Sequence, residues 1–316
     1  MADEKECDDS PKVDDPYETV AKILSYAVNE PILIKNAEKL FSPRPANIFS
    51  NAAEAEELER YIQANFVERF GAVYEPCVLE HDQSRAPKQV RTYHIDIAKE
   101  LTRSFHVCRD ATCRLHMLYV GLDCLRTKPE FWDEMTEETR KPYADALTGS
   151  FWDSVEIATI RLVSYWDRVG QLLDFVFFNI RQYERDGFPA VLERIKRNFA
   201  PTFAELDAHP SYNALIEYAS SEKTNGFKWL TRRRNLTIHS TQFRPHEDKP
   251  DILFDYEYNH YETRVVRGLA LKSPKEELDL VHIHLTKAAE LFRGAFDLAK
   301  LGIDLIEKDV ESRRRM

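Results

Sequence analysis

The sequence predicts a mainly α-helical protein with one small inserted β-hairpin. Glycine is scarce, with 9 glycines among 316 residues, against a usual share of roughly 7%. Glu, Arg, Leu and Ala are abundant, and these residues favour helices. Apolar residues in the longer segments recur at the three- and four-residue spacing of a helix face. These observations favour a bundle of long antiparallel helices over a turn-rich β architecture.

The length allows one large domain or two modest ones. We expect three regions: an acidic, disordered tail over 1–16, an N-terminal helical region over 17–90, and a helical domain over 91–316. The tail has almost no large apolar side chain that a core could bury. Its acidic residues are Asp3, Glu4, Glu6, Asp8, Asp9, Asp14 and Asp15.

The N-terminal region contains one substantial predicted helix, over 53–70. Prolines break the segment 17–50 into short helical pieces and make 75–90 a loop. The predicted helix has one apolar face at four-residue spacing. That face consists of Leu58, Ile62, Phe66 and Phe70.

Six helices are predicted in the remainder of the chain. They cover 93–126, 147–184, 188–198, 211–222, 226–243 and 274–311. The second has an apolar stripe that keeps the 3.6-residue spacing of a helix almost perfectly. This stripe contains Leu162, Trp166, Val169, Leu173, Val176, Phe177 and Ile180. The last begins at a predicted capping box, with Ser273 as the cap, Pro274 at the first position and Glu276 closing the box.

Residues 251–271 have a different period. Ile252, Phe254, Tyr256 and Tyr258 alternate with polar neighbours, as on a half-buried strand. The segment is therefore predicted to be a β-hairpin inserted between helices.

Charge and cysteine content restrict the class of protein. The net charge of −10 argues against broad, non-specific nucleic-acid binding, although residues 228–234 carry four positive side chains and no acid. Five cysteines without a C-x-x-C pair, and no secretory leader, indicate buried free thiols in a reducing cytoplasm. The most apolar run, 169–180, is too short to span a bilayer, so we expect no membrane partner.

The segment Arg234-Asn235-Leu236-Thr237-Ile238-His239 offers the most specific chemistry. A histidine moves protons near neutral pH, and a guanidinium stabilises a phosphate that gains negative charge. In the predicted helix Arg234 lies on one apolar stripe with Leu230 and Ile238, where its charge needs an acid or a phosphate. His239 lies about 140° around the helix axis from Arg234. A second copy of the chain across a two-fold axis would bring the two side chains together.

The pattern R-N-x-x-x-H on a helix that follows long antiparallel helices resembles HEPN domains (higher eukaryote and prokaryote nucleotide-binding). The patch Tyr165-Trp166-Asp167-Arg168-Val169-Gly170-Gln171-Leu172-Leu173 is similar to helices of bacterial HEPN-type families with a large helical domain. The resemblance covers 147–243 and, more loosely, 90–310. Many HEPN proteins are metal-independent ribonucleases of toxin–antitoxin, abortive-infection and CRISPR systems.

The resemblance implies roles for individual residues. Arg234 and His239 would be the catalytic pair, and Asn235 would orient them. Antitoxin-modified members have a tyrosine two residues after the histidine; here that position is Thr241, so control by modification is not indicated.

The residues around the motif suggest further contacts. Asp167 belongs to a line of polar residues along its predicted helix. This line is either exposed to solvent or turned toward the motif helix. In the second case Asp167 would hold Arg234 or His239 by a hydrogen bond. Three cations close to the motif either bind RNA phosphates or are ordinary surface residues: Lys228, Arg232 and Arg233.

We therefore expect a metal-independent endoribonuclease that acts as a homodimer without a cofactor. It would cleave RNA by 2′-hydroxyl attack to a 2′,3′-cyclic phosphate. By resemblance the setting is phage defence or a stress response, with a regulatory protein or antitoxin as a further partner. One alternative is a catalytically silent HEPN-like module that binds RNA, a nucleotide or a protein.

The other alternative is a helical interaction protein in which Arg234 pairs with a core acid. His282 and His284 lie two residues apart on a helix and make a poor metal pair, so we interpret them as core or surface histidines.

Overall fold

The computed structural model describes residues 29–68, 87–128, 135–178, 187–239, 269 and 271–314. Side chains are not described at 40, 66–68, 87–98, 239 and 309–314. The predicted tail over 1–16 lies outside the described residues. The chain divides into two compact units, 1–44 and 45–316. In the first unit, residues 29–37 are helical and lead into the 3₁₀ helix η1 (Glu38–Leu40).

The second unit begins with α2 (Ala52–Ile62), which continues as the π-helical turn η2 (Gln63–Glu68). The Asn51 side chain caps α2 by accepting a hydrogen bond from the Glu54 N–H at 3.1 Å. The predicted helix over 53–70 is therefore found. Tyr61 donates a hydrogen bond to Asp297, so this segment contacts the later helices.

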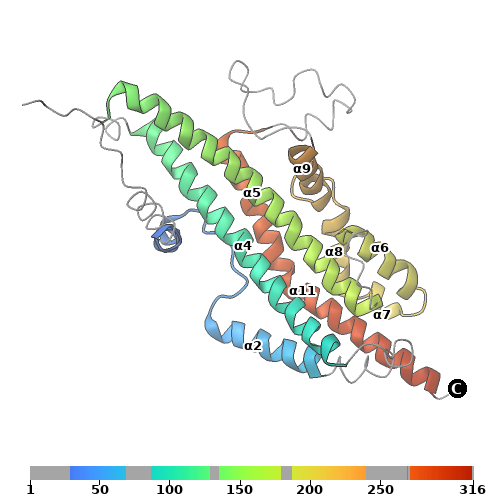
Figure 1. The fold of residues 1–316 in the computed structure, drawn as a ribbon. Helices are drawn as coiled ribbons and strands as arrows, with labels where there is room; N and C mark the ends of the chain where they lie inside the picture. The colour runs from blue at the N-terminus through green and yellow to red at the C-terminus, as the bar shows by residue number, and fades with distance from the viewer. Residues whose placement is uncertain are drawn as a thin grey trace, which may run out of the picture. The chain divides into compact units, whose positions relative to one another are not determined.

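Three long helices form the bundle of the second unit: α4 (Pro87–Thr127), α5 (Glu137–Phe178) and α11 (Pro274–Arg314). Figure 1 shows α4 and α5 as an antiparallel pair, with α11 alongside both and running in the direction of α5. The prediction of a mainly α fold is confirmed. The capping box at the start of α11 is also confirmed, because the Ser273 N–H donates to Glu276 at 3.0 Å and the Ser273 hydroxyl contacts the same carboxylate.

Shorter helices form a second layer against α5 and α11: α6 (Phe188–Phe199), α7 (Ala204–Asp207), α8 (Pro210–Ser220) and α9 (Phe227–His239). Two adjacent aromatic residues of α5 contact the two layers, one each. Tyr165 faces the bundle, where its hydroxyl donates to the Ala288 carbonyl of α11 at 3.2 Å. Trp166 is fully buried in the other direction, with its ring 4.6 Å from that of Tyr218 and 5.0 Å from that of Phe188. Helix α5 thus contacts both layers, and the described part of its predicted apolar stripe is buried between them.

Two predicted helix starts differ from the structure. Helix α5 begins at Glu137 instead of residue 147. Helix α4 begins at Pro87 instead of residue 93. Pro87 was predicted to lie in a loop, but a proline at the first helical position loses no helix hydrogen bond, so it is compatible with a helix start.

The predicted β-hairpin cannot be compared in full, because 251–268 lie outside the described residues. No strand occurs in the part of the chain that the structure describes. Cys108 and Cys113 are buried, as predicted, whereas Cys124 is half-buried. Among the described helices, none combines the length and apolar character needed to cross a membrane.

We predict that Gly170→Ala destabilises the protein by about 1–3 kcal/mol, because a methyl group would overpack the α5–α6 contact. A Cβ at Gly170 would lie 3.0 Å from the Phe188 Cα, which is backbone and cannot move aside cheaply. Urea denaturation followed by circular dichroism measures the change.

Gly149→Ala on the same helix is the matched control. Nothing lies within 4 Å of a Cβ at that position. Because alanine has a higher helix propensity than glycine, this substitution should leave the free energy of unfolding unchanged or raise it by up to about 1 kcal/mol. Equal destabilisation by both substitutions would contradict the α5–α6 packing.

Candidate functional site

Helix α9 carries most of the predicted site residues, and a tight turn sets its start. The Lys228 N–H donates to the Ser221 carbonyl at 3.2 Å. Gly226 permits this close approach, since a Cβ there would lie 2.4 Å from the Ser221 carbonyl oxygen. The helix then packs against α5 through a buried face. That face contains Phe227, Trp229, Leu230, Arg233, Leu236 and Thr237.

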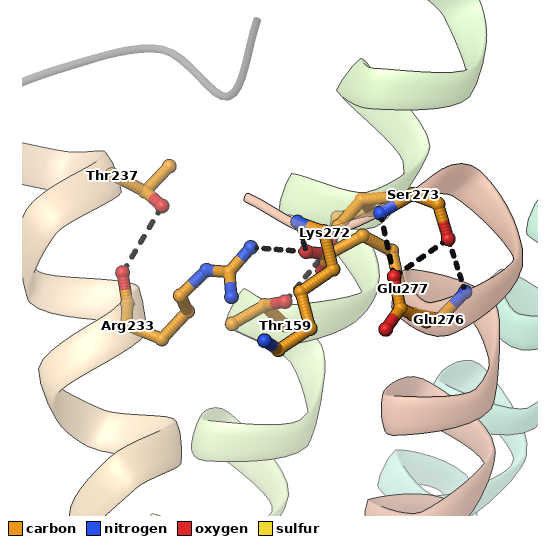
Figure 2. Close-up of polar contacts among 8 residues, drawn as sticks. Thr159, Arg233, Thr237, Lys272, Ser273, Glu276 and Glu277 are labelled. Carbon is orange, nitrogen blue, oxygen red and sulfur yellow. Dashed lines mark hydrogen bonds and ion pairs between the residues drawn. The ribbon is translucent and has the colours of Figure 1, made fainter. Parts of the chain in front are cut away.

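A buried ion pair fixes the rotation of α9. The Arg233 guanidinium donates to a carboxylate oxygen of Glu277 at 2.8 Å, and both side chains are almost fully buried, at 1% and 3% exposure. The same oxygen accepts the Lys272 N–H at 2.7 Å. The guanidinium also lies over the Trp229 ring at 5.2 Å. Figure 2 shows Arg233 reaching from α9 to Glu277 in the first turn of α11.

This pair corrects two sequence-based expectations. Arg233 was expected to grip RNA phosphates, but its burial against Glu277 removes it from the surface. Arg234 was expected on the core stripe with Ile238, yet Ile238 is 49% exposed and Arg234 is only half-buried. The role of a buried arginine paired with an acid thus belongs to Arg233. Adjacent helix positions differ by about 100°, so Arg234 points away from the core.

Arg234 instead lines a pocket between α5, α9 and the start of α6. The pocket has a volume of about 280 Å³. Asp167 lines the same pocket, so the structure places this carboxylate next to the motif helix. The remaining polar and charged lining side chains are Lys228, Thr231 and Arg232.

The charge of Asp167 depends on this arrangement. Burial raises the pKa of Asp167 above its ordinary value, while the neighbouring guanidinium groups of Arg234 and Arg168 oppose the shift. The Phe188 N–H also lowers the pKa by donating to the carboxylate. Asp167 and Arg234 are therefore electrostatically coupled across the pocket.

Lys228 and Arg232 share one acidic partner. The Lys228 ammonium lies 3.5 Å, and the Arg232 guanidinium 3.4 Å, from the same Glu222 oxygen. All three side chains are substantially exposed, and exposed ion pairs contribute little to stability because water screens them. An anionic ligand could therefore replace Glu222 at little cost.

The other two motif residues are Asn235 and His239. Asn235 is exposed on α9. His239 is the last residue of α9, and its side chain lies outside the described residues. Because both residues belong to one α-helix, positions 234 and 239 differ by about 140° around its axis.

Buried histidines also hold α9 in place. The His284 ring stacks on the Trp229 ring at 5.7 Å. Its two nitrogens contact the Tyr218 hydroxyl at 3.1 Å and the Thr224 carbonyl at 3.0 Å. His284 and His282 are both buried, which agrees with their interpretation as core or surface histidines.

His282 also takes part in a contact that the sequence did not predict. Its Nε2 lies 3.1 Å from His116 Nδ1 on α4. No local sequence pattern links two residues that lie 166 positions apart in the chain. Among the described residues, no group of three or more His, Cys, Asp or Glu side chains could hold a metal ion.

No protein-family model matches the chain, and no curated protein or solved structure is significantly similar to it. The resemblance to HEPN domains therefore rests on the R-N-x-x-x-H pattern and the patch around Asp167. These two patches lie on helices that pack against each other, α9 and α5.

We predict that Arg233→Met lowers the free energy of unfolding by about 3–5 kcal/mol, because it leaves Glu277 as a buried, unpaired charge. The double variant R233M/E277Q should recover part of this loss, since the amide that replaces the carboxylate is neutral and can still accept the Lys272 N–H. Urea denaturation measures both.

Arg232→Met is the matched control for Arg233. It removes a neighbouring, exposed arginine and should change stability by less than about 1 kcal/mol. If R232M and R233M destabilise equally, the assigned rotation of α9 is wrong.

We also predict that acid destabilises the protein through its buried histidines. Burial lowers the pKa of His282 and of His284 from the ordinary 6.5 to about 4. The unfolded state therefore binds more protons once the pH falls below 6.5, and stability is lost progressively down to about pH 4.

Between pH 6.5 and 4.5 each histidine should contribute a loss of roughly 2–3 kcal/mol. Denaturation curves measured across this pH range give the slope of the free energy of unfolding against pH. His284→Gln should flatten it, because the variant lacks the group that titrates. An unchanged slope would refute the contribution of His284.

Proposed function

We propose that this protein is a HEPN-like endoribonuclease that cuts RNA without a metal and acts as a homodimer. The observation that carries the proposal is the pocket in which Arg234 faces Asp167, with Lys228 and Arg232 at its edge. It concentrates positive charge beside a coupled carboxylate on a chain of net charge −10. Local field governs binding at a small site more than the total charge does.

The proposed reaction needs one proton acceptor, one proton donor and one stabilised oxyanion. The RNA 2′-oxygen forms a bond to the adjacent phosphorus, and the bond from phosphorus to the 5′-oxygen breaks. His239 takes the 2′-hydroxyl proton, and a proton returns to the 5′-oxygen. The products are a 2′,3′-cyclic phosphate and a free 5′-hydroxyl. An internal nucleophile held close to the phosphate supplies the rate advantage of proximity.

Arg234 would stabilise the negative charge on the phosphate during this step. Asp167 would position Arg234, since the two groups line one pocket and interact electrostatically. Asn235 would orient the reacting groups. Lys228 and Arg232 would bind neighbouring phosphates by exchanging Glu222 for RNA.

The helical offset between positions 234 and 239 supports a dimer. Two residues about 140° apart on one helix do not share a face. A second copy across a two-fold axis would bring His239 of one subunit toward Arg234 of the other. By resemblance, the activity would serve phage defence or a stress response under the control of a partner protein.

The alternative is a HEPN-like module that binds RNA, a nucleotide or a protein partner without cleavage. The observation that favours it is the small size of the pocket, about 280 Å³, which suits a single phosphate group with part of its sugar. Binding would then require Lys228, Arg232 and Arg234 but not His239.

We predict that the purified protein cleaves labelled RNA in excess EDTA and leaves 2′,3′-cyclic phosphate ends. DNA should not be cut, because it lacks the 2′-hydroxyl. His239→Ala and Arg234→Ala should each lower the rate by about 10²–10⁴-fold. Gel analysis of end groups and single-turnover rates provides the measurement.

Arg197→Ala is the control, because Arg197 is an exposed arginine on α6 outside the pocket. It should leave the rate unchanged, and all variants should melt within a few degrees of the wild type. RNA binding without cleavage by the wild type would favour the silent module. Cleavage that requires a metal would reject the proposed chemistry.

A further inference from the structure

A second, larger cavity lies between α2 and α4. Its volume is about 570 Å³, within the roughly 300–1,000 Å³ that is typical of small-molecule sites. The α2 side is mainly apolar and includes Ala55, Leu58 and Ile62. Phe49, just before α2, extends this apolar wall.

The α4 side of the cavity is polar. The lining residues of α4 are Lys99, Thr102, Arg103 and His106, at positions i, i+3, i+4 and i+7, so they form a single face of the helix. Helices ordinarily pack through apolar faces. Here a polar face of α4 lies opposite an apolar face of α2, and the two walls do not complement each other.

The charges on this face favour an anion. Lys99 and Arg103 are both cations four residues apart, and like charges at this spacing repel each other. The acid that lines the cavity is Glu59 on α2. Arg103 also pairs with Glu100 on its own helix. That pair is exposed, so an incoming carboxylate could displace Glu100 at little cost.

We propose that this cavity binds a linear-chain carboxylate, an amphipathic anion of the fatty-acid type. The hydrocarbon chain would lie against Leu58 and Ile62, and the carboxylate would bind between Lys99 and Arg103. Such a ligand satisfies both walls at once, because its alkyl chain matches the apolar wall and its head group matches the cations. A nonionic chain of the same length would satisfy only the apolar wall.

Fluorescence titration of the full-length protein with 11-(dansylamino)undecanoic acid tests the proposal. Dodecanoate should displace the probe, and dodecanol should compete about tenfold less well, because it lacks the charge. Extending the competitor from decanoate to dodecanoate should strengthen binding by up to about fourfold for each methylene group.

Two sets of variants locate the site. K99Q/R103Q should weaken dodecanoate binding about tenfold while leaving dodecanol unchanged. Ala55→Trp places a large side chain in the cavity and should abolish binding of both. The matched control K196Q/R197Q removes two exposed cations from α6, outside the cavity, and should have no effect.

Several outcomes would overturn the proposal. Absence of probe binding, equal competition by dodecanol and dodecanoate, or equal effects of K99Q/R103Q and K196Q/R197Q would each do so. If A55W unfolds, as judged by circular dichroism, the comparison of K99Q/R103Q with K196Q/R197Q still tests the proposal, because these variants change only surface residues.

Discussion

The buried ion pair between Arg233 and Glu277 determines how α9 presents its other side chains. Two charges removed from water are tolerated only when they are paired and hydrogen-bonded. Arg233 must therefore face the first turn of α11, where Glu277 also accepts the Lys272 N–H. Once this rotation is set, the next residue, Arg234, turns about 100° away and enters the pocket that contains Asp167. The candidate site is thus a consequence of a structural contact one residue away.

Helix α5 connects that contact to the rest of the fold. Tyr165 bonds to α11, while the adjacent Trp166 packs against α6 and α8. Asp167 follows these two residues and reaches the edge where the two layers meet. The Asp167 carboxylate therefore comes from a helix that contacts both layers, and the Arg234 guanidinium comes from a helix that an ion pair and the His284–Trp229 stack hold in place.

The two cavities share one physical origin. In each, polar side chains of one helix face a neighbouring helix without the apolar complement that closes ordinary helix contacts. Arg234 and Asp167 create this situation between α9 and α5, and Lys99 and Arg103 create it between α4 and α2. At both cavities exposed cations pair with an acid, Glu222 or Glu100, and a charged ligand can replace that acid at little cost.

The sequence determined the features that depend on local spacing. It predicted the helical class, the apolar stripe of α5 and the cap at Ser273, and it offered proximity to the motif helix as one of two interpretations of Asp167. Only the tertiary structure decided which arginine is buried. Arg233 rather than Arg234 faces the core because it pairs with Glu277, which is 44 residues away from Arg233 in the chain. The His116–His282 contact spans 166 residues. Local periodicity cannot choose such partners, because the cost of burying a charge or an imidazole depends on groups that only folding brings near.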